Sequence, residues 1–179
     1  PVFDDNGDVD YIIKFASDIT AQKQRNADYE GQITAINKSQ AVIEFDLEGN
    51  ILNANENFLA AMGYSLSEIK GQHHSMFVDP SYKLSAEYAA FWQSLKAGEH
   101  SEGEYKRIAK GGREIWIRAS YNPIFDSSGK PFKVVKFATD VTQDKLKNAY
   151  FEGQINAISK SQAVIEFDVD GTIITANDN

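Results

Sequence analysis

The clearest strand signal in the sequence is an alternation of apolar and polar residues at positions 41–46. Ala41, Ile43 and Phe45 fall on one face and their neighbours on the other, which is the period-two pattern of a half-buried strand. The next four residues, Leu-Glu-Gly-Asn, have the composition of a tight turn. A second apolar run at 51–54 follows. The pattern therefore predicts two adjacent strands joined by a hairpin turn.

Three helical segments are expected after this pair of strands. Asn55 is placed to cap a short helix that Gly63 ends. Ser65 and Glu68 have the spacing of a capping box for a further helical turn. The longest predicted helix carries an apolar stripe at helical spacing and closes at Gly98. The residues of this stripe are Leu84, Tyr88, Phe91, Trp92 and Leu95.

Three longer strand patterns complete this part of the chain, at residues 102–109, 113–125 and 132–141. Glycine-containing turns at 110–112 and 126–129 connect them. Connections of this length require antiparallel neighbours, and the clustered helices must cover one face of the resulting sheet. The order of elements, β-β-α-α-α-β-β-β, therefore predicts an α+β domain.

An internal repeat organises the whole chain. Residues 1–57 recur as residues 123–179, with about 32 identities in the 57 aligned positions. A repeat of this length corresponds to a domain plus a linker rather than to one unit of a solenoid. We therefore expect one complete domain between two partial copies. The predicted parts are a C-terminal domain fragment at 1–20, a linker helix at 21–37, a complete domain at 38–142, a linker helix at 143–160 and an N-terminal domain fragment at 161–179.

The two linkers are polar and favour helix, and each carries sparse apolar residues with the spacing of a heptad seam. These residues are Tyr29, Ile33 and Ile36 in the first linker and Phe151, Ile155 and Ile158 in the second. A helix of about 18 residues spans roughly 27 Å. Such helices are long enough to pass a rotation or a shift from one domain to the next.

Composition excludes several classes of protein. Eighteen Lys and Arg against 26 Asp and Glu give a net charge of −8, which disfavours nucleic acid as a partner. The absence of cysteine excludes disulfides and thiolate sites and is consistent with a reducing, cytoplasmic location. No apolar stretch is long enough to span a membrane. Apparent catalytic signals, such as Glu102 and Glu104 or the Lys-Gly-Gly turn at 110–112, lack a catalytic context, so we expect no enzymatic activity.

The complete copy resembles a PAS domain, a small sensory module with a helical flap over a ligand cleft. The motifs that carry the resemblance are AVIEFDLEGNILNANENFLAAMGY, GQHHSMF, FWQSLKAGEH, KGGREIWIRASYNPIFD and KFATDVT. More narrowly, it is similar to the PAS domains of bacterial aerotaxis and methyl-accepting chemotaxis transducers, including transducers with tandem PAS units. The resemblance implies a five-stranded antiparallel sheet of order 2-1-5-4-3 and a sensory function. The signalling output domain of such transducers is absent from this chain.

The resemblance also implies site residues in the cleft, namely Asn55, His73, His74, Tyr88 and Trp92. Aerotaxis PAS domains bind FAD with a tryptophan near the flavin ring, and Trp92 matches that position. At residues 77–80, however, the sequence reads Phe-Val-Asp-Pro where flavin-binding members carry an Arg-His pair. Another branch of the family binds haem, for which His73 or His74 is the candidate axial ligand. FAD, haem and a cleft without a cofactor remain open, and no other metal site is expected.

Signal relay is expected where the last strand meets the linker helix. The family pairs an Asp-x-Thr motif with this junction, and the motif occurs as Asp140 and Thr142 and again as Asp18 and Thr20. The same residues serve as plain helix caps if no signal passes through them. Trp116 is expected to face away from the cleft, toward a linker helix or a partner domain.

Two functions fit these observations. The first is a sensory module that detects a redox, oxygen or small-molecule cue in its cleft and relays it through the linker helices. The second is a ligand-free dimerisation or interaction spacer. In the spacer, Met76, Phe91, Trp92 and Ile117 fill the cleft. Either function implies a homo-oligomer formed through the PAS domain and linker helices. The partial copies contribute a last strand at 12–19 and a first strand at 163–168, which are expected to pair with complementary fragments across chains.

Overall fold

The computed structural model describes residues 1–3 and 5–179 and divides the chain into two units, 1–38 and 39–179, which are treated separately. In the first unit, β1 (Val2–Phe3) pairs antiparallel with β2 (Val9–Tyr11). Helix α1 (Thr20–Ser39) follows, and none of its side chains is buried. Residues 12–19, predicted as a strand that pairs across chains, form no ladder within the described chain. A strand requires a neighbour to satisfy its backbone N–H and C=O groups, and this segment has none within the described chain.

The second unit contains the predicted five-stranded antiparallel sheet. Its strands are β3 (Ala41–Phe45), β4 (Ile51–Ala54), β5 (Ser101–Ile108), β6 (Glu114–Phe125) and β7 (Pro131–Asp140). They lie in the order β4-β3-β7-β6-β5, which is the expected order 2-1-5-4-3. Every adjacent pair is antiparallel. The predicted fold is therefore confirmed, with strand boundaries within a residue or two of those expected.

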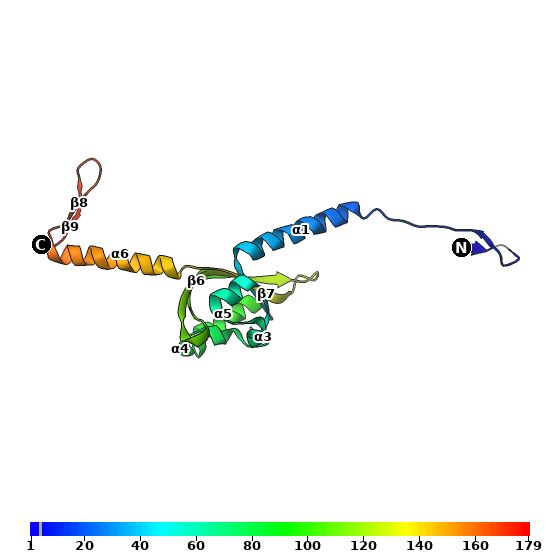
Figure 1. The fold of residues 1–179 in the computed structure, drawn as a ribbon, viewed down its shortest axis with the longest axis horizontal. Helices are drawn as coiled ribbons and strands as arrows, with labels where there is room; N and C mark the ends of the chain where they lie inside the picture. Colours follow the sequence, from blue (N-terminus) through cyan, green and yellow to red (C-terminus); the bar gives the residue numbers. More distant parts are fainter. Residues whose placement is uncertain (4) are drawn as a thin grey trace. The chain divides into compact units, whose positions relative to one another are not determined.

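Short helices cover one face of this sheet (Figure 1). They are α2 (Glu56–Met62), α3 (Leu66–Ile69), the 3₁₀ turn η1 (His74–Phe77), α4 (Pro80–Lys83) and α5 (Ala86–Lys96). A second 3₁₀ turn, η2 (Lys110–Gly112), joins β5 to β6. Asn55 caps α2, and Gly63 ends it with a φ of 75°. The prediction that Leu84 belongs to the apolar stripe is wrong: Leu84 is 85% exposed, because the Ser85 side chain accepts a hydrogen bond from Tyr88 N and α5 starts after it.

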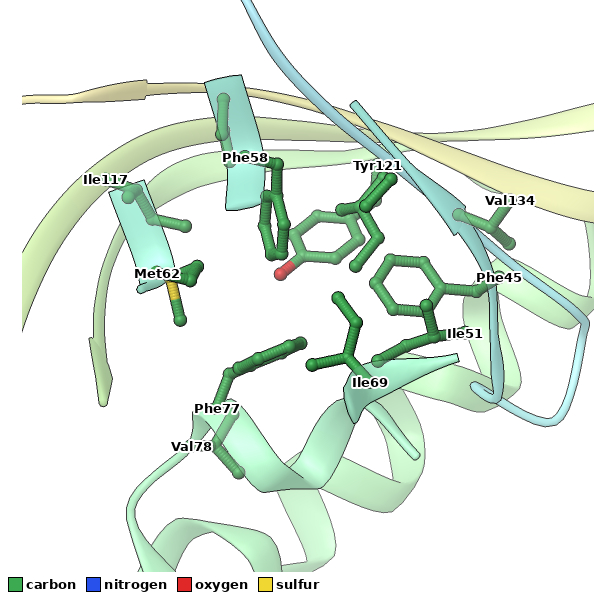
Figure 2. Packing of buried hydrophobic residues seen from close by; sticks show 14 of the residues in the cluster. Phe45, Ile51, Phe58, Met62, Ile69, Phe77, Val78, Ile117, Tyr121 and Val134 are labelled. Carbon is green, nitrogen blue, oxygen red and sulfur yellow. The ribbon is translucent and has the colours of Figure 1, made fainter. Parts of the chain in front are cut away.

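The core lies between the inner face of the sheet and these helices (Figure 2). Apolar side chains from β3, β4, β6 and β7 meet those from α2, α3, α5 and η1. Figure 2 also shows Tyr121 pointing from the sheet into this interior. Tyr121 is fully buried, so its hydroxyl group must find partners inside the domain.

The chain continues as α6 (Thr142–Ser161), followed by the hairpin of β8 (Ile165–Phe167) and β9 (Ile173–Ala176). The strand predicted over 163–168 is thus shorter and pairs within the chain. Its register repeats that of β3 and β4, including the irregularity at the last pair. Burial differs sharply, however: Phe167 is 54% exposed, whereas its repeat equivalent Phe45 is fully buried. None of the helices in the described ranges combines the length and the hydrophobicity that a membrane span requires.

Candidate functional site

His74 lies at the centre of the core, at the start of η1. It is fully buried, with Nδ1 2.9 Å from the Tyr88 hydroxyl and Nε2 3.0 Å from the Tyr121 hydroxyl. The Arg107 guanidinium donates to the same Tyr121 oxygen over 3.2 Å. The arrangement is satisfied when Tyr121 donates its proton to Nε2 and the Nδ1–H of His74 donates to Tyr88. Burial lowers the pKa of His74 well below its usual value, assisted by the charges of Lys136 and Arg107.

Aromatic rings surround this histidine. Phe45 and Trp92 pack edge-on against the imidazole at centroid distances of 5.3 and 5.4 Å. Tyr88 stacks with it at 5.9 Å, and burial raises the pKa of Tyr88 to about 12. The indole N–H of Trp92 is buried without a well-aligned acceptor, although the Tyr88 hydroxyl lies close enough to interact with it. The structure therefore brings together three of the predicted site residues in one aromatic cluster.

His73, the fourth predicted residue in this region, lies at the edge of the cluster. Its Nδ1 accepts a hydrogen bond from Ser75 N at 3.1 Å, which leaves Nε2–H to donate to the Glu48 carbonyl oxygen at 2.9 Å. The ring is 5.9 Å from that of Trp92. His73 thus ties η1 to the turn between β3 and β4.

Substitution of Gly49 by alanine tests how tightly this edge is packed. Gly49 has a φ of +89°, and a Cβ atom there would lie 2.7 Å from His73 Nε2 and 3.0 Å from the Trp92 ring. We expect Gly49→Ala to cost about 1–2 kcal/mol for the left-handed backbone and about 1–3 kcal/mol more for overpacking. Gly129→Ala is the matched control, because Gly129 has a φ of +80° but open space around its Cβ position. Equal losses of unfolding free energy for the two variants, measured by urea denaturation, would contradict this packing.

Asn55 does not join the cluster. Its Oδ1 accepts hydrogen bonds from Phe58 N at 3.0 Å and Val42 N at 2.9 Å, and its Nδ2 donates to Gln40 O at 2.8 Å. The side chain thus fastens the start of α2 to the beginning of β3. Asn177, its repeat equivalent, makes the corresponding bonds to Val164 N and Gln162 O. These hydrogen bonds give Asn55 a structural role, which is to hold α2 and β3 together.

Arg107, Tyr121 and Lys136 belong to the cluster but were not among the residues expected from the sequence. Lys136 is 1% exposed and lies opposite Tyr121 on the neighbouring strand, with Nζ 4.9 Å from the ring centroid. Arg107 is 4% exposed. Strand alternation places Lys136 on the same face as Val134 and Ala138. The sequence signal that could have identified Lys136 is therefore a cationic residue on the apolar face of a predicted strand.

The residues do not fit haem ligation. An axial histidine needs a free ring nitrogen, but both nitrogens of His74 and both nitrogens of His73 are engaged in hydrogen bonds. No group of three or more His, Cys, Asp or Glu residues that could hold a metal ion occurs in the described ranges. A histidine-bound haem would require this network to break.

The segment 77–80 supplies no cation for a flavin diphosphate. Phe77 and Val78 are buried in the core, and Asp79 caps α4 by accepting a hydrogen bond from Ser81 N at 2.8 Å. Trp92 packs edge-on against Phe45 at 5.6 Å. The positions expected for FAD therefore form a packed aromatic core and a helix cap, and we assign no cofactor from them.

The predicted relay motif joins the sheet to α6. The Asp140 side chain accepts a hydrogen bond from Thr142 N at 2.8 Å, and Thr142 Oγ1 accepts one from Trp116 N at 2.9 Å. Lys145 on α6 lies 5.3 Å from the Trp116 ring centroid and forms an ion pair of 2.6 Å with Glu104 on β5. Trp116 thus faces the linker helix, as expected. These contacts fasten the first turn of α6 to two strands of the sheet.

The earlier copy of the motif has the same local geometry. The Asp18 side chain accepts a hydrogen bond from Thr20 N at 2.8 Å, as Asp140 does from Thr142. This bonding to Thr20 lowers the pKa of the Asp18 carboxyl group. In both copies the Asp side chain thus accepts a hydrogen bond from the first backbone N–H group of the long helix.

Comparison with known proteins agrees with this fold. Residues 51–138 match the family of the PAS fold. The central domain is a PAS domain. The PAS domain of a protein from Colwellia psychrerythraea shares the fold, with a TM-score of 0.56 and 21% identity, over 65% of this chain and 98% of that one.

Two relatives match more than half of this chain. The chain is 44% identical to the biofilm dispersion protein BdlA of Pseudomonas aeruginosa over 82% of this chain and 35% of the relative. It is 34% identical to the aerotaxis receptor of Escherichia coli over 56% of this chain and 20% of the receptor. The chain thus spans about a third or less of these relatives. The expected resemblance to PAS domains of chemotaxis and aerotaxis transducers is confirmed.

Proposed function

We propose that this chain is the sensory segment of a chemotaxis-type signal transducer. Its PAS domain senses a redox, oxygen or small-molecule cue in the core and relays it through the linker helices, without catalysing a reaction. The similarity to BdlA over most of the chain is the observation that carries this proposal. We further propose that the segment works in the cytoplasm and acts on a signalling domain outside these residues.

The relay depends on two strands that carry different contacts on their two faces. On the inner face, Tyr121 of β6 and Arg107 of β5 contact the cluster around His74. On the outer face, Trp116 of β6 and Glu104 of β5 contact α6. A change of occupancy in the core that shifts these strands would therefore move the attachment of α6.

Exposed apolar residues on the linker helices support a homo-oligomer. The seam residues Tyr29, Ile33 and Ile36 on α1 and Phe151, Ile155 and Ile158 on α6 are each between 39% and 65% exposed. Their heptad spacing suits packing of each helix against its copy in a second chain. Exchange of the terminal fragments between chains remains a further prediction for this assembly.

A ligand-free spacer is the alternative, and the packing of the core favours it in one respect. Trp92 and Ile117 are buried in the core, and Met76 and Phe91 pack against it, as the spacer requires. The two functions differ in what they require of the α6 junction. A spacer needs only the helix surface for pairing, whereas a sensor needs the hydrogen bond between Thr142 and Trp116.

Replacement of Thr142 by valine tests the relay. The variant keeps the shape of the side chain but leaves Trp116 N without its acceptor, which costs about 1–3 kcal/mol. We expect faster amide exchange in the first turn of α6, by roughly tenfold or more, and loss of the behavioural response in cells that carry the full-length transducer. Thr139→Val, at an exposed position of β7, is the control. A normal response with Thr142→Val, together with loss of dimer in Ile155→Glu, would instead support the spacer.

A further inference from the structure

Two basic side chains lie deep in the PAS core, and no acidic residue is buried with them in the part of the chain that the structure describes. Lys136 and Arg107 are 1% and 4% exposed. The buried polar and charged residues of the described chain are His74, Ser75, Arg107 and Lys136, a set that contains no Asp or Glu. By contrast Lys133, three residues earlier on β7, pairs with Glu44 at 2.8 Å. The inner face of the sheet thus carries two buried basic side chains with no buried acidic partner among the described residues.

The hydrogen-bond donors of Arg107 are not all paired. Arg107 donates from Nη1 to the Lys106 carbonyl oxygen at 2.8 Å and from Nη2 to the Tyr121 hydroxyl at 3.2 Å. Its Nε is buried, and none of the described residues provides it with an acceptor. Buried charges in proteins are normally paired, because leaving one unpaired costs several kcal/mol. Burial and the neighbouring Arg107 charge lower the pKa of Lys136 well below its usual value, a shift that a bound anion would oppose.

We propose that Arg107 and Lys136 bind the anionic group of a small organic carboxylate, a proposal that rests on the sensory function above and names its ligand class. A guanidinium group is suited to a carboxylate, and Arg107 Nε is the donor left for it. The ring centroids of Phe91 and Tyr121 are 4.9 Å apart, and the Arg107 guanidinium carbon lies 4.7 Å from the Tyr105 ring centroid. These aromatic surroundings favour a planar ligand.

The route of entry lies beside Arg107. Tyr82, Phe91 and Tyr105 pack against the core but are only partly buried. Because the core is filled, the carboxylate enters as these rings move aside, and its binding displaces side chains on β5 and β6. These are the strands whose outer faces hold α6, so the binding site and the relay share the same elements.

Thermal unfolding of the full chain tests the proposal, with sodium benzoate and sodium acetate compared against sodium chloride at equal ionic strength. We expect the wild-type melting temperature to rise with carboxylate concentration and to saturate, as ligand binding to the folded state requires. Lys136→Met and Arg107→Gln should weaken this apparent affinity by roughly tenfold or more, as loss of a charged hydrogen bond does. Lys133→Met is the matched control on the same strand and should keep the full response.

Lys136→Met also provides an independent readout. In chloride alone it should be at least as stable as the wild type, because methionine replaces a buried basic group that has no acidic partner. A wild-type response to carboxylates no larger than that to chloride, or an equal response in Lys136→Met, would overturn the proposal. Stabilisation by inorganic phosphate without stabilisation by carboxylates would also overturn it. These results concern binding alone, so the Thr142→Val test of the sensory function stands apart from them.

Discussion

Replacement of Phe45 by alanine is expected to lower the free energy of unfolding of the PAS domain by about 3–5 kcal/mol. Phe45 is fully buried and packs edge-on against both His74 and Trp92. Truncation would remove the transfer free energy of the ring and leave a cavity beside the two side chains that define the cluster. Urea denaturation followed by tryptophan fluorescence measures the effect, since Trp92 reports directly on this part of the core.

The internal repeat supplies a matched control for this variant. Phe167 occupies the equivalent position in the same local sequence and the same strand register, but it is 54% exposed. Phe167→Ala should therefore change the unfolding free energy by less than about 0.5 kcal/mol at low protein concentration. A large loss that grows with concentration would contradict the exposed position. It would show instead that the terminal hairpin is covered in an assembly, as fragment exchange between chains requires.

The pair Phe45 and Phe167 also shows which features of this chain can be predicted from sequence. Hairpin register, helix caps and the alternation of strand faces depend on residues close in the chain, so they recur in both copies. Burial depends on distant strands and helices. The same segment is therefore core in one copy and exposed in the other. The order of the sheet followed from the family resemblance and from the short connections between strands.

The candidate site was only partly predictable for the same reason. His74, Tyr88 and Trp92 lie on or beside segments with recognisable motifs, and the structure brings them together. Lys136 and Arg107 lie on strands whose other charged residues are solvent-exposed or ion-paired, and charged strand residues are usually exposed. Lys136 is buried on the central strand β7, whereas Arg107 is buried on the edge strand β5, where it contacts Tyr105 and Tyr121. The hydrogen bonds to His73 and His74 likewise could not be predicted from the spacing of residues in the sequence. These bonds are the observation that argues against haem ligation.

The stability of the PAS domain is expected to fall as the pH decreases from 7.5 to 5. The unfolded-state pKa of a histidine is about 6.5, whereas burial holds the pKa of His74 in the folded state well below this value. Below pH 6.5 the unfolded chain therefore binds a proton that the folded domain excludes. The free energy of unfolding then falls by up to about 1.4 kcal/mol per pH unit, which amounts to about 2 kcal/mol at pH 5. The carboxyl group of Glu68, whose pKa the Lys110 ammonium and Ser65 lower to about 2, titrates below this window.

Replacement of His74 by glutamine isolates this effect. The glutamine amide can still donate one hydrogen bond and accept another, so Tyr88 and Tyr121 can retain partners while the titrating group is removed. We expect the variant to be less stable than the wild type at pH 7.5, by about 1–3 kcal/mol, but to lose much less stability on acidification. His100→Gln, at an exposed position, should keep the wild-type pH dependence. The free energy of unfolding is measured by urea denaturation at half-unit intervals of pH. If it falls equally with pH in the wild type and in His74→Gln, His74 must take up its proton in the folded core as readily as in the unfolded chain. The network of a neutral imidazole between two tyrosine hydroxyl groups would then be incorrect.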